Sequence, residues 1–409
     1  MNENKKTLYF ITESYEKNKM FYYNEIVELS KLYNIRFVST TGIENGVCDI
    51  PNTELFFYSN KVSKLKKVKY AIQYIFDKRC HKEHKDIFLD KKKLLYRFFR
   101  SIEFYAYANE FYLWFMDNVY LGDEEALYYT YWCNYYTLGL ALHYCNHSKL
   151  NFVTRLHGFD LYDNQNDSGR LPFRDIINNR VERLFFVSKL SREYYLKKYS
   201  SSLESKLILN RLGTKGLINY YLDNKSDEFV LVSCSNVIPL KRVDYIIDAL
   251  SAVDFPVKWI HFGDGMQYDL IKAQAEQKLQ KNNISYELRG RVANNEILDF
   301  YSNNKMDAFI NVSFSEGCPM SIMEAMSVGT PIIATDVGEA RILTDGNGIL
   351  LDSNPLISDI TMAIEKIYKL KMYDTEVYNN MRSESTKKWK ALFNVDNNIK
   401  DFIQELQKL

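Results

Sequence analysis

The sequence contains no C-x-x-C pair, although it has six cysteines. They stand singly along the chain, at Cys48, Cys80, Cys133, Cys145, Cys234 and Cys318. Scattered single cysteines do not suit a zinc site or a disulfide framework, and they fit a reducing compartment. The first residues, M-N-E-N-K-K-T, lead into only six strand-like residues, too few for the apolar core of a signal peptide. The sequence therefore predicts a cytoplasmic protein.

An excess of charge of one sign is also lacking. The chain has 53 Lys and Arg against 52 Asp and Glu, so its overall balance gives no reason to expect nucleic acid as a partner. The motifs G-x-G-x-x-G after the first predicted strand and G-x-x-x-x-G-K-[ST] are both absent, which argues against a dehydrogenase and a P-loop enzyme. No Asp-x-Asp triplet occurs, so a metal-bridged diphosphate site of that type is unsupported.

No apolar run has the composition of a membrane span. The segment from Ala126 to Cys145 carries no charged side chain over twenty residues, which is about the length of a spanning helix. It also contains six tyrosines and His143, and it is too polar for a span. We therefore expect a buried strand, Ala126 to Trp132, followed by a buried helix.

The sequence does contain short apolar strands that alternate with helices. The first predicted strand is Thr7 to Thr12, and a second series opens at Phe229. Such alternation predicts βαβ units and mostly parallel sheets. A chain of 409 residues is long for one core, and the polar stretch from Gly213 to Glu228 suits a linker between two α/β halves. Two such halves leave a cleft between them, which is a preferred ligand site.

Residues 61–100 break this pattern. They hold fourteen Lys or Arg against four acids, interleaved with aromatic and aliphatic side chains. Basic helices of this kind can lie on an anionic membrane surface. The alternative is a solvated helical insertion whose apolar stripe packs on the sheet, and the sequence leaves both open.

The stretch from Ser313 to Ala334 carries the clearest chemistry: S-F-S-E-G-C-P-M-S-I-M-E-A-M-S-V-G-T-P-I-I-A. A short strand precedes it, and Pro319 stands where the first helical turn is expected, since its missing N–H costs nothing there. Glu316 lies before this helix and Glu324 inside it. Eight helical residues span roughly 12 Å.

A helix N-terminus between two carboxylates offers N–H groups and a positive dipole end to an anion. A diphosphate at the N–H groups, with polyols at the two carboxylates, matches a nucleotide-sugar. Lys241 and Arg242 follow the strand that starts at Phe229 and are natural phosphate clamps. His157 ends another predicted strand, just before Gly158 and Asp160, at the edge where open α/β sheets bind ligands.

The segment E-G-C-P-M-S-I-M-E (316 to 324) resembles the E-x7-E signature of family 4 glycosyltransferases, a group of retaining enzymes with the GT-B fold. The chain looks most like the colanic-acid and exopolysaccharide branch of that family. The supporting segments, in the family's order, are F-Y-Y-N-E-I (21–26), Y-T-Y-W-C-N-Y-Y-T-L-G-L-A-L (129–142), R-L-H-G-F-D-L-Y (155–162), P-F-R (172–174), N-R-L-G-T (210–214), V-S-C-S-N-V-I-P-L-K-R-V-D (232–244) and H-F-G-D-G (261–265).

The resemblance implies an α/β protein of two Rossmann-like domains that face an inter-domain cleft. Residues 1–214 would form the acceptor-side domain, with a basic helical insertion at about 61–118. Residues 215–391 would form the nucleotide-sugar domain. A C-terminal helix, about 392–409, would cross back to the first domain.

The resemblance also implies roles for single residues. Glu316 and His157 would contact the donor sugar, and Lys241 and Arg242 would clamp the diphosphate. Arg242 would supply the second charge because the family's arginine five residues before the lysine is Asn236 here. The remaining predicted donor contacts are Glu324 at the ribose, Gly317, Cys318, Pro319, Met320 and Ser321 at the diphosphate, Gly290, Arg291 and Val292 along the base, and Asn236 and Gly263 in the neighbouring loops.

The resemblance implies a retaining transferase, and the missing Asp-x-Asp triplet leads us to expect that it needs no metal ion or other cofactor. Its donor would be a nucleotide-sugar, UDP-linked by expectation, and its acceptor a lipid-linked capsule, O-antigen or exopolysaccharide intermediate. The basic insertion adds an anionic membrane surface as a candidate partner, with the protein peripheral at the inner face. Two alternatives stay open: another GT-B enzyme, such as a UDP-sugar epimerase or a phosphorylase, and a non-catalytic sugar-binding assembly protein.

Overall fold

The computed structural model of the chain describes residues 5–16, 19–41, 48–59, 61–89, 93–123, 125–143, 150–217 and 228–409. Residues 218–227, most of the predicted linker, lie outside the described residues. The chain divides into two units. Unit 1 is Met1–Asn210 with Ile399–Leu409, and unit 2 is Arg211–Asn398.

Unit 1 is built on a parallel sheet whose strand order, over the described ranges, is β3-β2-β1-β4-β5-β6-β7. The strands are β1 (Thr7–Thr12), β2 (Asn34–Ser39), β3 (Thr53–Phe57), β4 (Leu127–Tyr131), β5 (Asn151–Leu156), β6 (Arg183–Phe186) and β7 (Leu207–Leu209). Every residue of β1, β2 and β4 is buried, as expected for a parallel sheet that is covered on both faces.

Helices cover both faces of this sheet. The helices of this unit are α1 (Lys19–Ser30), α2 (Lys64–Phe76), α3 (His81–Leu89), α4 (Leu94–Asn118), α5 (Tyr135–His143), α6 (Arg174–Arg180), α7 (Lys189–Tyr199) and α15 (Val395–Leu406). Successive β1 residues alternate between the faces. Tyr9 and Ile11 pack with α4 and α5, whereas Leu8 and Phe10 pack with α1 and with Phe402 of α15.

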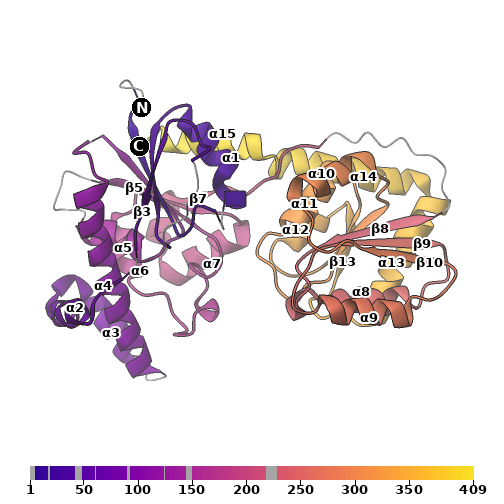
Figure 1. The fold of residues 1–409 in the computed structure, drawn as a ribbon, viewed down its shortest axis with the longest axis horizontal. Coiled ribbons are helices and arrows are strands. Elements are labelled where there is room, and N and C mark those ends of the chain that lie inside the picture. The colour runs from indigo at the N-terminus through magenta and orange to yellow at the C-terminus, as the bar shows by residue number, and fades with distance from the viewer. Residues whose placement is uncertain are drawn as a thin grey trace. The chain divides into compact units, whose positions relative to one another are not determined.

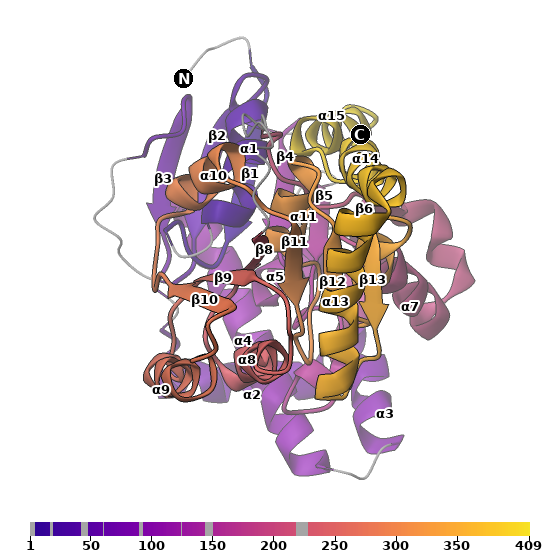
Figure 2. The same ribbon diagram turned by 90° about the vertical axis from the view of Figure 1, so that its right-hand side faces the viewer.

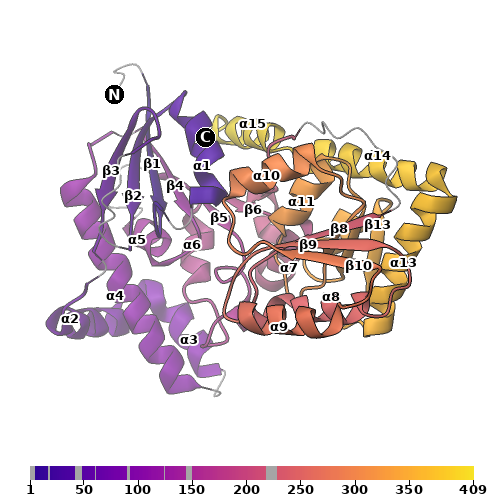
Figure 3. The ribbon, with the colours of Figure 1, turned by 45° about the vertical axis from the view of Figure 1, so that its right-hand side comes forward.

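The predicted basic insertion forms α2, α3 and α4. Figures 1 and 3 show α2 and α3 flanking α4 rather than lying on the sheet. The uncharged segment near residue 130 is the buried strand β4 followed by the buried helix α5, as predicted. None of the described helices combines the length and the apolar character that crossing a membrane requires.

Unit 2 repeats the plan with the parallel strand order β10-β9-β8-β11-β12-β13. Its strands are β8 (Phe229–Cys234), β9 (Val257–Phe262), β10 (Ile284–Leu288), β11 (Ala308–Asn311), β12 (Ile332–Thr335) and β13 (Gly348–Leu351). Its helices are α8 (Val243–Leu250), α9 (Tyr268–Lys278), α10 (Asn294–Asn303), α11 (Met320–Ser327), α12 (Ala340–Thr344), α13 (Ile357–Tyr373) and α14 (Thr375–Leu392).

Two separate cores pack against the faces of the unit 2 sheet. One core joins the strands to α8, α9 and α13, and the other joins them to α10, α11, α12 and α14. Figures 1 and 3 show α8 and α9 on one face and α10 and α11 on the other. Figure 2 shows α13 beside β13. The prediction of two Rossmann-like α/β domains is confirmed.

Each sheet has a point where the order of its strands reverses. That point lies between β1 and β4 in unit 1 and between β8 and β11 in unit 2. Open α/β sheets bind ligands at the carboxyl ends of the strands beside such a point. In unit 2 the loops that leave β8 and β11 there carry Lys241 and Glu316. The fold therefore puts two of the predicted site residues at its expected ligand edge.

Candidate functional site

The helix α11 begins after the turn that follows β11. Pro319, with φ −72° and ψ 108°, is its N-cap, so the helix starts one residue later than predicted because the backbone at Pro319 is still extended. No side chain caps this end. The first N–H groups of a helix have no acceptor within the helix. The positive end of α11 is thus able to bind an anion.

Lys241 and Glu316 form an ion pair next to this helix end. The Nζ of Lys241 lies 2.5 Å from Oε1 of Glu316, and the two side chains are only 18% and 11% exposed. The same oxygen accepts hydrogen bonds from Ser313 Oγ at 2.7 Å and from Asn311 Nδ2 at 3.2 Å. Three donors on one oxygen fix the carboxylate, and the carboxylate in turn fixes the ammonium.

The backbone of residues 316 and 317 packs against Gly338 and Glu339. A Cβ on Gly338, whose φ is +55°, would lie 2.4 Å from the carbonyl oxygens of Glu316 and Gly317. The N–H of Glu339 donates to the carbonyl of Gly317 at 3.1 Å. No heavy atom of the described chain lies within 4 Å of a Cβ built on Gly317. The turn is therefore supported on one side and leaves room for a ligand beside Gly317.

Glu324 lies one turn into α11 and is buried. Its Oε1 accepts a hydrogen bond from Asn294 Nδ2 at 3.3 Å. Burial raises the pKa of Glu324 to about 7, against a smaller lowering by Asn294. Cys234 and Tyr301 face this carboxyl, and burial raises the pKa of both. Near neutral pH, Glu324 is therefore the group of this cluster that changes charge.

Three further predicted segments lie at the carboxyl ends of β8, β9 and β10. Gly263 has φ +144°, and a Cβ there would lie 1.8 Å from the carbonyl oxygen of Ser235. Its N–H donates to the carbonyl of Gly290 at 2.9 Å. These loops pack backbone against backbone, which requires glycine at 263. Asn236 and Arg291 are exposed beside them, and their predicted contacts with a nucleotide stay predictions.

Arg242 does not join the Lys241–Glu316 pair. Its Nη1 donates to the carbonyl of Ser353 at 3.0 Å, and its Nη2 donates to Asn354 Oδ1 at 2.8 Å. The guanidinium carbon lies 4.9 Å from the centre of the Phe314 ring. The structure thus brings Lys241, and not its neighbour, to Glu316, and the clamp role of Arg242 stays a prediction.

His157 belongs to unit 1, directly after β5. Its N–H and that of Gly158 donate to the Asp160 carboxylate at 2.8 and 3.2 Å, so Asp160 shapes the loop. Both ring nitrogens are buried without a hydrogen-bond partner in the described part of the chain. Burial, with a smaller effect of Arg155, holds the pKa of His157 well below its ordinary value. The imidazole is neutral at pH 7, and its expected role at the donor sugar stays a prediction.

Several residues around these sites were not predicted. Asn311 and Ser313 hold Glu316, and Asn294 holds Glu324. Asn311 had a signal in the sequence, since it is polar at the carboxyl end of the apolar run A-F-I-N-V. Trp132 had none: its φ is +101°, a value that bulky residues rarely adopt, and its ring centre lies 5.5 Å from that of His157.

No three His, Cys, Asp or Glu side chains gather as a metal site within the described ranges. Lys241 is the cation that the structure brings to Glu316 beside the start of α11.

Comparison with known proteins relates unit 2 to sugar transferases. Residues 221–388 match the family described as glycosyl transferases group 1. An uncharacterized glycosyltransferase of Methanocaldococcus jannaschii is 32% identical over 213 residues, which are 51% of this chain and 56% of that protein. A putative teichuronic acid biosynthesis glycosyltransferase of Bacillus subtilis, TuaC, is 25% identical over 244 residues, 57% of this chain and 59% of that protein. The chain thus spans just over half the length of these two relatives.

Among solved structures, Anabaena HepE in complex with UDP-glucose superposes with a TM-score of 0.61 at 16% identity. The superposition covers 98% of this chain and 100% of that chain. At this identity the likeness establishes the fold, which is GT-B over both units, as predicted.

Proposed function

We propose that this chain, whose residues 221–388 match glycosyl transferases group 1, transfers a sugar from a nucleotide-sugar to a saccharide acceptor. The observation that carries the proposal is the Lys241–Glu316 pair at the N-terminus of α11, at the ligand edge of the unit 2 sheet. A fixed ammonium and free helix N–H groups suit a diphosphate, and a fixed carboxylate suits sugar hydroxyls.

The chemistry we propose is departure of the nucleoside diphosphate with retention at the sugar carbon. Negative charge grows on the phosphate that leaves, and preorganised donors at that position lower the barrier most. Lys241 and the start of α11 supply such donors without a metal ion. The acceptor hydroxyl attacks the sugar carbon on the face that the diphosphate leaves and passes its proton to the departing diphosphate, so no side chain of the enzyme needs to act as nucleophile.

We further propose a UDP-linked donor and a lipid-linked polysaccharide intermediate as acceptor. Support for the donor comes from HepE, which was solved with UDP-glucose. Support for the acceptor class comes from the names of relatives, which include teichuronic acid and O-antigen biosynthesis glycosyltransferases. Both assignments go beyond the family match.

Screening nucleotide-sugars by thermal shift tests the donor, and release of UDP with and without saccharide acceptors tests transfer. A transferase is stabilised by its donor and releases UDP faster when an acceptor is present. An epimerase would convert the donor alone, with no acceptor. A sugar-binding assembly protein would give no turnover under any condition. Either of the last two results would replace the proposal.

The affinity for UDP is expected to rise by up to about tenfold between pH 6 and pH 8. The ribose hydroxyls donate more strongly to the Glu324 carboxylate than to the neutral carboxyl, which keeps one acceptor oxygen, and its pKa of about 7 makes the ionised fraction grow about tenfold over that interval. Titration calorimetry across this pH range measures the effect. Glu324→Gln is the control, because it keeps only the titration of UDP itself. Equal pH profiles for the two proteins would remove Glu324 from the ribose site.

The raised pKa of Glu324 also predicts that the free energy of unfolding falls as the pH rises, opposite to the trend for UDP affinity. Because the folded pKa lies above the ordinary value of 4.5, the stability that Glu324 contributes is complete below pH 4.5 and is lost as the pH rises through 7. Nucleotide binding and folding therefore favour different protonation states of this carboxyl.

We also propose that α2 rests on an anionic membrane. One face of this helix buries Tyr70 and Tyr74 against the core of unit 1. The opposite face exposes large apolar side chains at helical spacing, and Leu65 and Phe76 are 86% and 77% exposed. The apolar side chains of this stripe are Leu65, Val68, Ile72, Ile75 and Phe76. A continuous exposed stripe of this kind marks an interaction surface, and the neighbouring exposed Lys64 and Lys69 favour anionic lipid.

Ile72→Ser with Phe76→Ser is expected to weaken binding to phosphatidylglycerol vesicles at least tenfold, since inserting an apolar side chain contributes on the order of 1 kcal/mol or more. Vesicle flotation at low salt measures binding. Met266→Ser, which removes a side chain that is 84% exposed in unit 2, is the matched control. Equal flotation of the double variant and the control would show that α2 does not face the membrane.

A further inference from the structure

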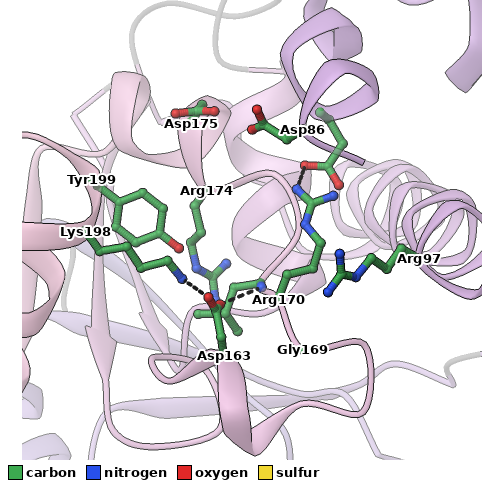
Figure 4. A pocket seen from close by; sticks show the side chains of 11 residues that line it. Asp86, Arg97, Asp163, Gly169, Arg170, Arg174, Asp175, Lys198 and Tyr199 are labelled. Carbon is green, nitrogen blue, oxygen red and sulfur yellow. Dashed lines mark hydrogen bonds and ion pairs between the residues drawn. The ribbon is translucent and has the colours of Figure 1, made fainter. Parts of the chain in front are cut away.

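A polar pocket of about 270 Å³ lies in unit 1, between the helices of the insertion and the segment that follows His157. Figure 4 shows charged side chains converging on it from α3, α4, α6, α7 and the loop before α6. Its lining residues are Glu83, Asp86, Arg97, Asp163, Gly169, Arg170, Leu171, Arg174, Asp175, Lys198 and Tyr199. The predicted donor site makes no use of any of them.

Three of the four acids in the lining already have partners. Glu83 Oε2 lies 2.8 Å from Arg170 Nη2, and its other oxygen accepts from Ser101 Oγ at 2.7 Å. Asp163 pairs with Lys198 at 2.5 Å. Asp175 pairs with a lysine of α3, Lys82. These carboxylates are held by their own cations and backbone groups.

The guanidinium of Arg174 is different. This residue is 4% exposed, and its Nη2 donates to the carbonyls of Cys133 and Asp160 at 2.8 and 2.7 Å. Its Nε and Nη1 are buried with no acceptor among the described residues, and so is Nη1 of Arg170. Each buried N–H left without an acceptor costs about 1–3 kcal/mol. The pocket therefore holds buried cationic donors that lack acceptors.

Lys198 lies close enough to these two arginines to feel their charge. Burial lowers the pKa of Lys198, and the nearby Arg174 and Arg170 lower it further, against the opposing effect of Asp163. A further anion in the pocket would relieve this repulsion and would accept from the buried guanidinium groups.

The helices α3 and α4, which form one side of the pocket, also expose large apolar side chains. Phe88 on α3 is 59% exposed, and Leu95 and Phe99, on either side of Arg97 on α4, are 69% and 64% exposed. Phosphate is the anion that arginine and lysine bind best in combination.

We propose that the pocket bounded by Arg170, Arg174 and Lys198 binds a phosphate group, carried by a lipid or free in solution. The site stands on unit 1 residues alone and does not depend on the proposed donor site in unit 2. A phosphate there would also contact the arginine that holds the carbonyl of Asp160, the residue that shapes the His157 loop.

Titration of inorganic phosphate and pyrophosphate into the Lys241→Ala protein tests the site while the candidate donor site is disabled. Lys198→Gln is expected to weaken binding about tenfold, because one of the cations is lost. Lys197→Gln, an exposed neighbour on the same helix, is expected to leave it unchanged. Asp86→Asn removes a negative charge from the lining and is expected to tighten binding about threefold, which a purely structural role would not produce.

Competition by vesicles separates the two sources of phosphate. If phosphatidylcholine vesicles with phosphatidic acid displace the bound phosphate and plain phosphatidylcholine vesicles do not, the ligand is a lipid phosphate. If neither vesicle competes while the Lys198→Gln and Asp86→Asn effects hold, the ligand is a soluble phosphate. Absence of phosphate binding, or binding that neither substitution changes, would overturn the proposal and leave water in the pocket.

Discussion

Lys241→Ala is expected to weaken UDP binding roughly 30- to 4,000-fold, because truncating one partner of a buried, hydrogen-bonded charge pair costs about 2–5 kcal/mol. Sugar transfer is expected to fall further, by about a hundredfold or more, since the ammonium also stabilises charge that appears only as the diphosphate leaves. The fold should survive, because Glu316 keeps Ser313 and Asn311 as donors. Calorimetry with UDP and a UDP-release assay measure the two effects.

Glu316→Gln tests the binding of the sugar separately from the binding of the diphosphate. The amide keeps the size of the side chain and can still accept from Lys241, so UDP affinity should change by less than about threefold. The advantage of a UDP-sugar over UDP should disappear, together with transfer, if this carboxylate holds the sugar hydroxyls. Lys272→Ala, an exposed lysine of α9, is the control for loss of charge in unit 2. Wild-type transfer by either Lys241→Ala or Glu316→Gln would falsify the site assignment.

The fold could be predicted because its strands carry a strong local signal. Runs such as T-L-Y-F-I-T (7–12) and F-V-L-V-S-C (229–234) are mostly apolar, and buried parallel strands favour that pattern. Right-handed crossovers then restrict the possible orders of strands, and ligands bind at the carboxyl edge of such a sheet. Lys241 and Glu316 stand next to strand ends in the sequence, so their meeting in space could be predicted from local features.

Other parts of the site depend on contacts that no local pattern encodes. Arg242 has the same sequence context as Lys241, yet its guanidinium bonds to Ser353 and Asn354, more than a hundred residues away. The phosphate pocket of unit 1 joins side chains between residues 83 and 199, and each of them alone resembles an ordinary surface charge. Such clusters follow from the way the helices of the insertion pack against the rest of unit 1, which the sequence left open between two alternatives.

A buried ion pair close to the His157 loop is expected to contribute strongly to the stability of unit 1. Nη2 of Arg155 lies 2.5 Å from Oε2 of Glu25, and the two side chains are 1% and 10% exposed. The hydroxyl of Tyr129 donates to Glu25 Oε1 at 2.8 Å and accepts from Arg155 Nε at 2.8 Å. The ring of Phe402 lies 4.7 Å from the guanidinium carbon. The pair thus joins α1, β4, β5 and α15 within unit 1.

Arg155→Ala is expected to destabilise unit 1 by about 3–5 kcal/mol, because it leaves the Glu25 carboxylate buried without its cation. Amide exchange in β4 and β5 should accelerate a hundredfold or more, since each 1.4 kcal/mol is a factor of ten. Hydrogen-exchange mass spectrometry measures this directly. Peptides from β8 and β9 of unit 2 are the internal control and should keep their wild-type rates.

Replacing both partners tests whether the pair itself or the unpaired charge sets this cost. Arg155→Met with Glu25→Leu removes both charges and keeps apolar volume, so its exchange in β4 and β5 should lie much closer to wild type than that of Arg155→Ala. Because Arg155 lies on β5, two residues before His157 in the loop that follows, the double variant also reports on catalysis. Restored stability with lost transfer would mean that the pair positions the His157 loop. Equal destabilisation by the single and double variants would mean that the interactions of the ion pair itself, and not the unpaired charge on Glu25, set the cost.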